Sequence, residues 1–251
     1  MLKISQYVKV SSLEEAYELN QKKNNVIVGG MHWLKMMDKM VGTAIDMSGL
    51  GLDQIVETED AFEIGCMVTL RQLEKHEGLN KYTAGAVADA VKDIVGVQFR
   101  NMATVGGSIW GRFGFSDVLT VFQAMDSYVE LYKGGIIPLE QFARMKKDND
   151  ILVRLIVKKT PCKVVYSSVR NQRTDFPVLA CAVAHMNGEY RASIGARPAR
   201  AMLIRSEMSD GFASYVAENA PTEGNIRGSA AYRTHLIRVL VERSMKELGG
   251  M

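Results

Sequence analysis

Two pairs of adjacent glycines are the residues best suited by type and position to bind an anion. Gly29-Gly30 follows a β-branched run, and Gly106-Gly107 lies between Thr104 and Ser108. Glycine lets the backbone approach a phosphate closely and adopt a positive φ, and a helix that begins after such a loop offers N–H donors and positive potential. For each pair we weigh two interpretations, a phosphate-binding loop and a simple tight turn.

Two such loops, well separated in the sequence, are able to hold the two ends of one pyrophosphate-containing ligand. Asp117 lies just beyond the second loop and is able to accept hydrogen bonds from sugar or ribityl hydroxyls. A simpler interpretation of Asp117 is a first-turn carboxylate that complements a helix dipole. The chain has neither G-x-G-x-x-G after a strand nor G-x-x-x-x-G-K-[ST], so a standard Rossmann site or P-loop is unsupported.

The remaining chemistry-bearing residues predict no metal site and no catalytic acid or base in this chain. The four histidines (His32, His76, His185 and His235) show no metal-ligand spacing, and no G-x-S-x-G elbow supports a hydrolase. His32 lies inside the first loop, where it is either an extra donor or a surface residue. We expect His185 to be structural and His235 to face solvent.

Composition narrows the class of protein. The 31 basic and 28 acidic residues nearly balance, which gives no electrostatic footprint for nucleic acid. Three cysteines, far apart in the sequence, favour neither a disulfide framework nor a four-cysteine iron–sulfur motif. The first residues lack the apolar run of a signal peptide, and no apolar stretch approaches the roughly 20 residues of a membrane span. We therefore expect a cytoplasmic protein.

The elements that would position these residues alternate between strands and helices. A strand at 7–10, a helix that a capping box opens at Ser12, a strand at 26–28 and a helix at 31–40 predict a βαβ-like start. Further expected strands are 43–47, 54–56, 61–65, 128–132, 163–168, 178–185 and 190–195, and expected helices begin near Thr69 and cover 83–96, 116–125 and 230–248, with 104–110 breaking the helical pattern. A boundary is expected at 158–161.

Several separate motifs together resemble the FAD-binding subunit of the xanthine dehydrogenase and carbon monoxide dehydrogenase family. The first loop, Val26-Ile27-Val28-Gly29-Gly30-Met31-His32-Trp33, falls where the family has its first FAD pyrophosphate loop. The segment 103–109, followed by Ser116-Asp117, resembles its most specific signature. The other matching segments are Tyr7 with 12–16, then 136–142, 192–198 and 231–236. The resemblance runs nearly from end to end of the chain.

The resemblance implies an α+β fold with a two-lobed FAD-binding domain at 1–158 (two α/β subdomains, about 1–53 and 54–158) and a smaller C-terminal α/β domain at 162–251. The FAD contacts that it implies are Val26, Ile27, Val28, Gly29, Gly30, Met31, His32, Trp33, Ile94, Thr104, Val105, Gly106, Gly107, Ser108, Asp117 and Leu152. Trp33 and Trp110 each follow a glycine loop, and core packing is the preferred interpretation of both over a contact with the adenine or the flavin.

The resemblance also implies a role within a complex. This chain would relay electrons through FAD to NAD, as part of an oxidoreductase of the xanthine dehydrogenase type. The molybdenum cofactor and the [2Fe–2S] clusters would belong to partner subunits. Alternatives are the same flavin relay for another substrate (a CoA thioester, an aldehyde, nicotinate or CO), or a nucleotide-binding module without redox chemistry.

The sequence departs from the family pattern in three places. Met31-His32 replaces a threonine followed by an acidic or other polar residue. Residues 111–115, Gly-Arg-Phe-Gly-Phe, replace an Ala-Ser-Pro-type segment in the expected flavin-side wall. Ser168 stands where a lysine often touches the flavin, so that contact is not carried over.

Overall fold

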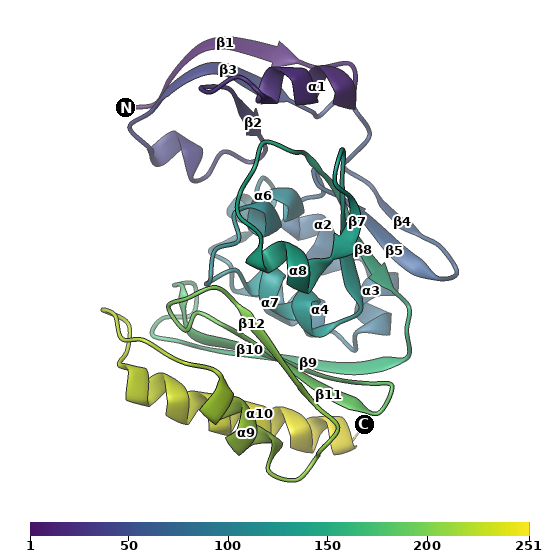
Figure 1. Ribbon diagram of the computed structural model, residues 1–251, viewed down its shortest axis with the longest axis vertical. Coiled ribbons are helices and arrows are strands. Elements are labelled where there is room, and N and C mark those ends of the chain that lie inside the picture. The colour runs from purple at the N-terminus through teal and green to yellow at the C-terminus, as the bar shows by residue number, and fades with distance from the viewer. Residues whose placement is uncertain (251) are drawn as a thin grey trace.

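The structure is a computed structural model that describes residues 1–250, and it contains three β-sheets arranged along the long axis of the molecule (Figure 1). A small parallel sheet lies at one end and a four-stranded antiparallel sheet at the other, with a five-stranded sheet and most of the short helices between them. This mixture confirms the predicted α+β class.

The N-terminal sheet contains the first predicted anion loop. Its strands β1 (Lys3–Lys9), β3 (Met40–Asp46) and β2 (Val26–Val28) lie in that order and are all parallel, which confirms a parallel strand at 26–28. Helix α1 (Leu13–Asn20) connects β1 to β2, and the Ser12 hydroxyl accepts a hydrogen bond from the Glu15 N–H, as the predicted cap requires. The sheet therefore delivers Gly29 and Gly30 at the carboxyl end of β2.

The helix predicted at 31–40 is wrong. Only a single 3-10 turn, η1 (Leu34–Met36), forms in this segment. Met31 adopts a left-handed backbone with φ 57°, which is incompatible with a continuous right-handed helix. Met40 instead begins β3 and pairs with Lys3. The methionine-rich run is thus a connection made of turns and one 3-10 helix.

The middle part of the molecule is an antiparallel sheet with short helices around it. Strands β4 (Ile55–Glu57), β5 (Ala61–Gly65), β8 (Leu152–Lys158), β6 (Ser127–Leu131) and β7 (Gly135–Pro138) lie in that order. The helices are α2 (Leu70–Lys75), α3 (Glu77–Tyr82), α4 (Ala86–Lys92), α5 (Val97–Arg100), α6 (Val105–Trp110), α7 (Asp117–Ala124) and α8 (Leu139–Arg144). The predicted helix starts at Thr69 and Ser116 are confirmed, because both side chains accept cap hydrogen bonds.

Two predictions in this region are wrong at the level of the backbone. The helix expected at 83–96 is reduced to α4, because left-handed residues Ala84 and Gly85 precede it and Val95 (φ 51°) follows it. The segment expected to break the helical pattern at 104–110 instead forms α6. Its start is stabilised by Thr104, whose hydroxyl accepts from the Gly107 N–H at 3.1 Å.

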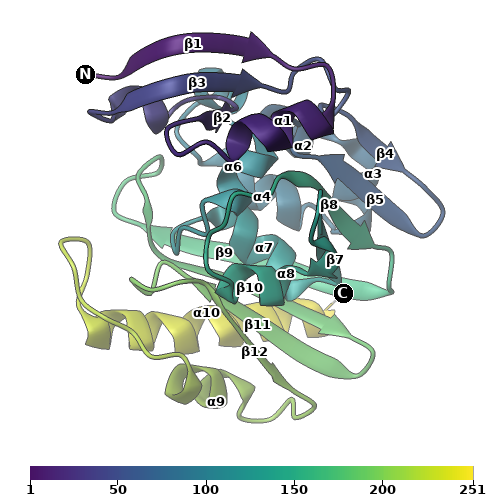
Figure 2. The same cartoon turned by 45° about the horizontal axis from the view of Figure 1, so that its top comes forward.

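The C-terminal part is a meander covered by helices on both faces. Strands β12 (Met202–Ser206), β11 (Glu189–Gly195), β10 (Pro177–Met186) and β9 (Cys162–Arg170) lie in that order. Helices α9 (Phe212–Asn219) and α10 (Ala230–Gly250) cover the outer face, and α4 and α7 pack on the inner face (Figure 2). The three predicted strands and the terminal helix are confirmed, whereas β12 was not predicted.

The burial of β10 shows how the two cores share one sheet. Ala180, Ala182 and Ala184 belong to the core of the first two parts, while Cys181 and Val183 belong to the core under α9 and α10. This alternation is the ordinary two-faced pattern of a strand. None of the helices in the described part of the chain combines the length and hydropathy that a membrane crossing requires.

Candidate functional site

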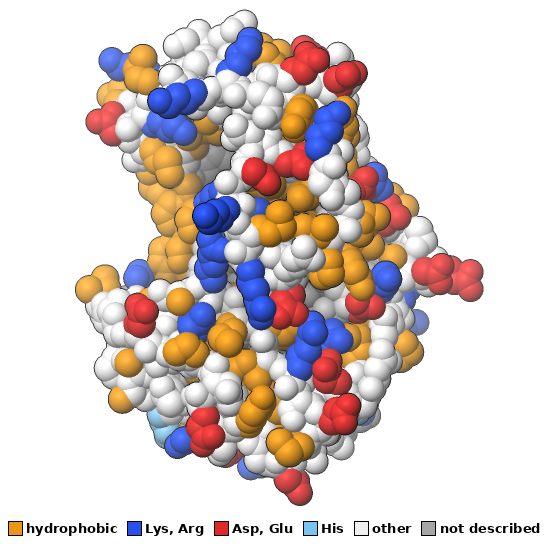
Figure 3. Space-filling model, viewed as in Figure 1, with side chains coloured by type: hydrophobic (Ala, Val, Ile, Leu, Met, Phe, Trp, Pro, Cys, Tyr) orange, Lys and Arg blue, Asp and Glu red, His pale blue; other side chains and the backbone are white. Residues whose placement is uncertain are grey.

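A cavity of about 750 Å³ lies where the first glycine loop, α6 and the start of α7 approach the connection between β9 and β10. In the space-filling view the molecule narrows between the N-terminal sheet and the rest, and hydrophobic side chains gather there (Figure 3). The volume lies within the range of small-molecule and cofactor pockets. Of the sixteen predicted cofactor contacts, the residues that line it are Val26, Ile27, Val28, Gly29, Gly30, Met31, His32, Trp33, Ile94, Thr104, Gly106, Gly107, Ser108, Asp117 and Leu152.

Val105 is the predicted contact that does not line this cavity. Its side chain is 1% exposed and belongs to the hydrophobic core, and its N–H donates to the carbonyl of Val68 at 2.8 Å. Val105 therefore supports the second loop from behind.

The first loop keeps its backbone donors available. Within the described part of the chain, none of the backbone hydrogen bonds uses an N–H of residues 29–33 as its donor. Met31 is left-handed (φ 57°), and a left-handed residue next to a right-handed one is the backbone pattern of anion-binding nests, in which successive N–H groups turn toward one point. This geometry favours the phosphate-binding interpretation of Gly29-Gly30 over a simple turn.

The second loop differs, because its donors are already engaged. The Gly106 N–H donates to the Cys66 carbonyl at 2.8 Å, and the Gly107 N–H donates to Thr104. The expectation that the helix start here supplies unpaired N–H groups is therefore wrong. What the loop offers is a surface without side chains at Gly107, which is exposed, next to the hydroxyl of Ser108.

The two loops contact each other directly. A Cβ atom on Gly29 would lie 2.9 Å from Oγ1 of Thr104, and one on Gly30 would lie 2.2 Å from the carbonyl oxygen of Met102. The absence of a side chain at Gly30 is thus required for the N-terminal sheet to approach the segment before α6. Two glycine pairs 77 residues apart thus lie side by side and line one cavity.

Asp117 has a more specific environment than a first-turn carboxylate requires. It is the first residue of α7, yet only 5% of it is exposed. One carboxylate oxygen lies 2.7 Å from Nη2 of Arg170, and the hydroxyl of Tyr166 donates to the same oxygen. Burial raises the pKa of Asp117, and the guanidinium opposes that rise, while Asp117 raises the pKa of Arg170. The dipole interpretation alone does not explain this buried pair.

A hydrogen bond links Asp117's helix to the second loop. The Ser116 hydroxyl accepts from the Leu119 N–H at 3.1 Å and donates to the Ser108 carbonyl at 3.0 Å. One residue therefore caps α7 and fixes it against α6. The Ser116-Asp117 step is thereby held against the helix that contains the second glycine pair.

The imidazole of His32 contacts Phe99, so its Nε2 is not free to bind a phosphate. Its ring stacks on Phe99 with centroids 3.8 Å apart, and Nε2 lies 3.2 Å from the Phe99 carbonyl oxygen. Burial, with Lys35 nearby, lowers the pKa of His32, which favours the neutral imidazole. The loop's anion-binding capacity thus resides in its backbone.

An aromatic cluster forms another part of the cavity wall. Trp33 is 42% exposed, which makes the core-packing interpretation wrong for this residue. Its ring lies 5.9 Å from Phe115 and 5.8 Å from Phe176, and Phe113 stacks on Phe115 at 5.2 Å. The Gly-Arg-Phe-Gly-Phe segment that departs from the family pattern thus supplies aromatic rings. Trp110 is half-buried: it packs against Phe142 and the hydrophobic core, and it also lines the cavity.

Sequence reasoning missed Arg170 and Phe176 as wall residues. Both come from β9 and its connection to β10, which the sequence placed in a separate domain. The available signal was the alternation along β9, which puts Tyr166, Ser168 and Arg170 on one face. Ser168, in the place of the expected lysine, accepts a hydrogen bond from Nε of Arg170 at 3.2 Å.

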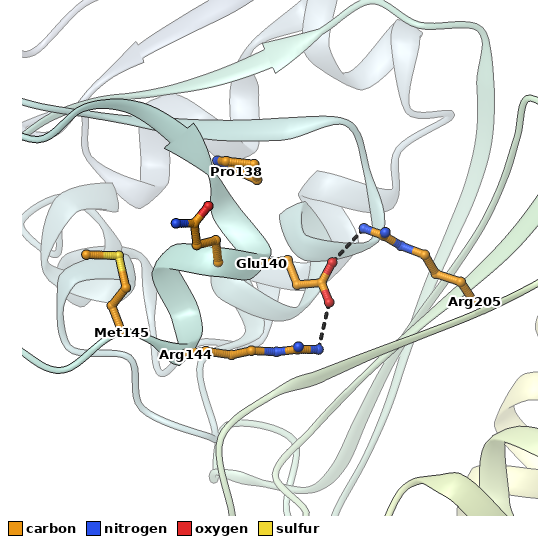
Figure 4. A pocket seen from close by; sticks show the side chains of 6 residues that line it. Pro138, Glu140, Arg144, Met145 and Arg205 are labelled. Carbon is orange, nitrogen blue, oxygen red and sulfur yellow. Dashed lines mark hydrogen bonds and ion pairs between the residues drawn. The ribbon is translucent and has the colours of Figure 1, made fainter.

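A second depression, of about 550 Å³, lies on the surface between α8 and β12 (Figure 4). The carboxylate of Glu140 lies between two guanidinium groups, 2.7 Å from Arg144 and 2.6 Å from Arg205. Both carboxylate oxygens are therefore occupied: the pair with Arg144 lies within α8, and the pair with Arg205 connects α8 to β12 of the C-terminal sheet. Among the described residues, no group of three or more His, Cys, Asp and Glu side chains is placed to hold a metal ion.

Comparison with known proteins identifies the family. Residues 2–159 match the family described as the FAD binding domain in molybdopterin dehydrogenase. The chain belongs to this family. Its cofactor is accordingly FAD, and the cavity fits that group because unpaired loop N–H groups, an exposed glycine surface and aromatic rings converge on it.

Relatives with similar sequences extend over nearly the whole chain. The Escherichia coli K12 protein YgfM is 24% identical over 253 residues, which cover 95% of this chain and 94% of that protein. The glyceraldehyde dehydrogenase medium chain of Sulfolobus acidocaldarius is 23% identical over 274 residues, with 96% and 97% covered.

Solved structures share the fold. A chain of carbon monoxide dehydrogenase from Hydrogenophaga pseudoflava superposes with a TM-score of 0.86 at 20% identity, covering 100% of this chain and 99% of that one. A chain of quinoline 2-oxidoreductase from Pseudomonas putida 86 gives 0.82 at 16% identity, covering 98% and 96%.

Proposed function

We propose that this chain is the FAD-binding subunit of a cytoplasmic molybdenum hydroxylase complex of the xanthine dehydrogenase type. One observation carries the proposal. The glycine loop after β2 and the glycine pair in α6 line one cavity together with Asp117. We also propose that 1–158, in lobes of about 1–53 and 54–158, is the FAD-binding domain and that 162–251 closes over part of it.

The chain's own residues bind and orient the cofactor in this proposal. The N–H groups of residues 29–33 would hold the pyrophosphate, and Gly107 would let it approach the second loop closely. Val26, Ile94 and Leu152 would provide apolar wall. When bound, FAD would supply the redox chemistry that links one-electron donors, the iron–sulfur clusters proposed for a partner, to the two-electron acceptor NAD⁺. No side chain of this chain has to act as an acid or base.

The metal chemistry would belong to partners. The three cysteines lie too far apart in sequence for a four-cysteine iron–sulfur motif, and two of them, Cys66 and Cys181, are buried. We propose that an iron–sulfur subunit and a molybdenum-binding subunit complete a hetero-oligomer. Xanthine or a related purine is the proposed substrate and NAD the proposed acceptor.

The visible spectrum of the purified chain tests FAD binding. Oxidised flavin should colour the protein yellow, with bleaching on reduction, and a stripped chain should regain the colour when FAD is added. A chain that stays colourless after incubation with FAD, alone and with its partners, would refute the flavoprotein function and leave a non-redox nucleotide module.

The substrate is tested on the complex. Co-purified partner subunits should support xanthine-dependent reduction of NAD⁺. Because the relatives' names include glyceraldehyde and carbon monoxide, an aldehyde and CO are assayed beside xanthine, a CoA thioester and nicotinate. Turnover with one of these, and none with xanthine, would remove xanthine as the substrate.

A further inference from the structure

The cavity wall contains one buried cation, the guanidinium of Arg170. Arg170 ends β9, and its side chain is 7% exposed. Among the lining residues in the described part of the chain it is the single lysine or arginine, whereas four aspartates, Asp117, Asp148, Asp150 and Asp175, also line the cavity. Burying a guanidinium is costly unless its geometry is well satisfied, so its contacts are informative.

Protein atoms fix the orientation of this guanidinium. Nη2 lies against Asp117, Nη1 donates to the Asp175 carbonyl, and Nε donates to Ser168. Arginine has five N–H donors in a planar fork. The described residues supply three acceptors, so two donors remain for a ligand in the cavity. The group is thus held in place and still able to bind.

The surroundings of Arg170 indicate which part of a ligand it meets. Phe176, six residues further on, lies 4.6 Å from Phe115 and also lines the cavity. Aromatic rings favour a planar ring system. The Asp117 carboxylate beside the guanidinium opposes a doubly charged pyrophosphate, for which the nest at residues 29–33 is better suited. The Arg170 part of the wall therefore fits an uncharged ring with carbonyl acceptors.

We propose that Arg170 is the cationic contact of the flavin ring in this chain, and that Asp117 and Tyr166 are its positioning residues. This inference rests on the proposed FAD-binding function. A flavin gains negative charge on its pyrimidine part when it is reduced. A fixed and buried guanidinium stabilises that charge, and so favours the reduced cofactor.

The test compares reduction potentials of the full chain reconstituted with FAD, at one fixed pH, by equilibration with a reference dye. Arg170→Met should lower the reduction potential of the flavin. At a given solution potential, the ratio of oxidised to reduced flavin should rise by about tenfold or more, which corresponds to about 30 mV for a two-electron couple. Arg170→Lys should keep most of the wild-type potential. Arg173→Met removes an arginine that is 82% exposed and does not line the cavity, so its potential should match wild type.

Arg170→Met leaves Asp117 as an unpaired buried carboxylate, which is strongly destabilising. The double variant Asp117→Asn with Arg170→Met removes both charges and keeps the net charge of the site. We expect the double variant to fold and to have a reduction potential below that of wild type. The reason is that, in the proposed arrangement, the lost guanidinium is nearer to the flavin ring than the lost carboxylate.

Three results would overturn the assignment. One is a wild-type potential in both Arg170→Met and the double variant. Another is weaker FAD binding at unchanged potential, which would place Arg170 on a different part of the cofactor. The last is an equal shift in Arg173→Met. Failure of the wild-type chain itself to take up FAD would refute the proposed function, and it is recognised before any variant is made.

Discussion

Replacing Gly107 by alanine should stabilise the FAD-free chain and weaken its binding of FAD. Gly107 is the third residue of α6, and a Cβ there would approach only the Thr104 hydroxyl, at 3.2 Å. The methyl group therefore meets no backbone atom, and only the Thr104 hydroxyl has to shift by a few tenths of an ångström to accept it. It would, however, stand on the exposed surface that lines the cavity. One substitution thus separates folding from cofactor binding.

The two magnitudes follow from different physical terms. Glycine in a helix is less stable than alanine by about 0.5–1 kcal/mol, which for a chain of this size raises Tm by about 1–4 °C. A methyl group forced between packed surfaces costs about 1–3 kcal/mol. On binding, that cost corresponds to a Kd for FAD that is roughly 5- to 150-fold higher.

The assay measures Tm of the stripped chain and Kd by titration with FAD, followed by flavin fluorescence. Gly106→Ala is the matched control in the same helix, because its Cβ would lie 2.6 Å from the Cys66 carbonyl oxygen. It should lower Tm, since the backbone of Cys66 has to move. A Gly107→Ala chain with wild-type affinity for FAD would refute the role of the second loop in the site. A lowered Tm would refute the inference that the Thr104 hydroxyl can shift to accept the methyl group.

Further predictions concern the first loop, its histidine and the C-terminal part. Gly30→Ala should lower both Tm and FAD affinity, since its Cβ would lie 2.2 Å from the Met102 carbonyl oxygen; a variant with wild-type Tm would contradict this packing. The pKa of His32 is lower in the folded chain than in the unfolded chain, so its contribution to the free energy of unfolding is present above about pH 6.5 and is lost as pH falls through the folded pKa. In urea unfolding, His32→Gln should therefore lose less stability than wild type between about pH 6.5 and 5. Equal losses in the two chains would refute the assignment. Arg233→Met should lower the free energy of unfolding by about 3 kcal/mol or more, because Arg233 is 1% exposed and donates to the carbonyls of Val178, Glu223 and Gly228; an unchanged urea midpoint would count against this role.

Local signals in the sequence predicted much of the fold. Side-chain caps at Ser12, Thr69 and Ser116 and the β-branched run before Gly29 mark element starts that the structure confirms. These signals act within a few residues, so one sequence is enough to find them. The glycine loops could be found for the same reason.

The errors have a common physical origin in tertiary packing. Residues 31–40 have the apolar content of a helix, but Met40 gains a parallel partner in Lys3 and Met31 turns left-handed. The segment 104–110 contains two glycines, yet it is helical because Thr104 caps it and Cys66 accepts from Gly106. Propensity is a weak prior that such contacts override.

The wall at Arg170 could not be predicted because its partners are distant in the chain. Asp117 and Arg170 are 53 residues apart, in elements that the sequence assigned to different domains. Charge type alone does not show which of 31 basic residues is buried. Only the packing of α7 on the C-terminal sheet brings the pair together.

Each glycine pair divides two tasks between its members, and this explains why a pair is needed. Gly30 and Gly106 each meet backbone, the Met102 and Cys66 carbonyls, so their lack of a side chain permits the walls of the cavity to close. Gly29 and Gly107 are the exposed members, and each faces Thr104. A single glycine can satisfy either the packing against protein or the approach of a ligand from the other side. Because the two requirements fall on adjacent residues, a loop that is packed against protein on one side and open to the cavity on the other has to carry two glycines in succession.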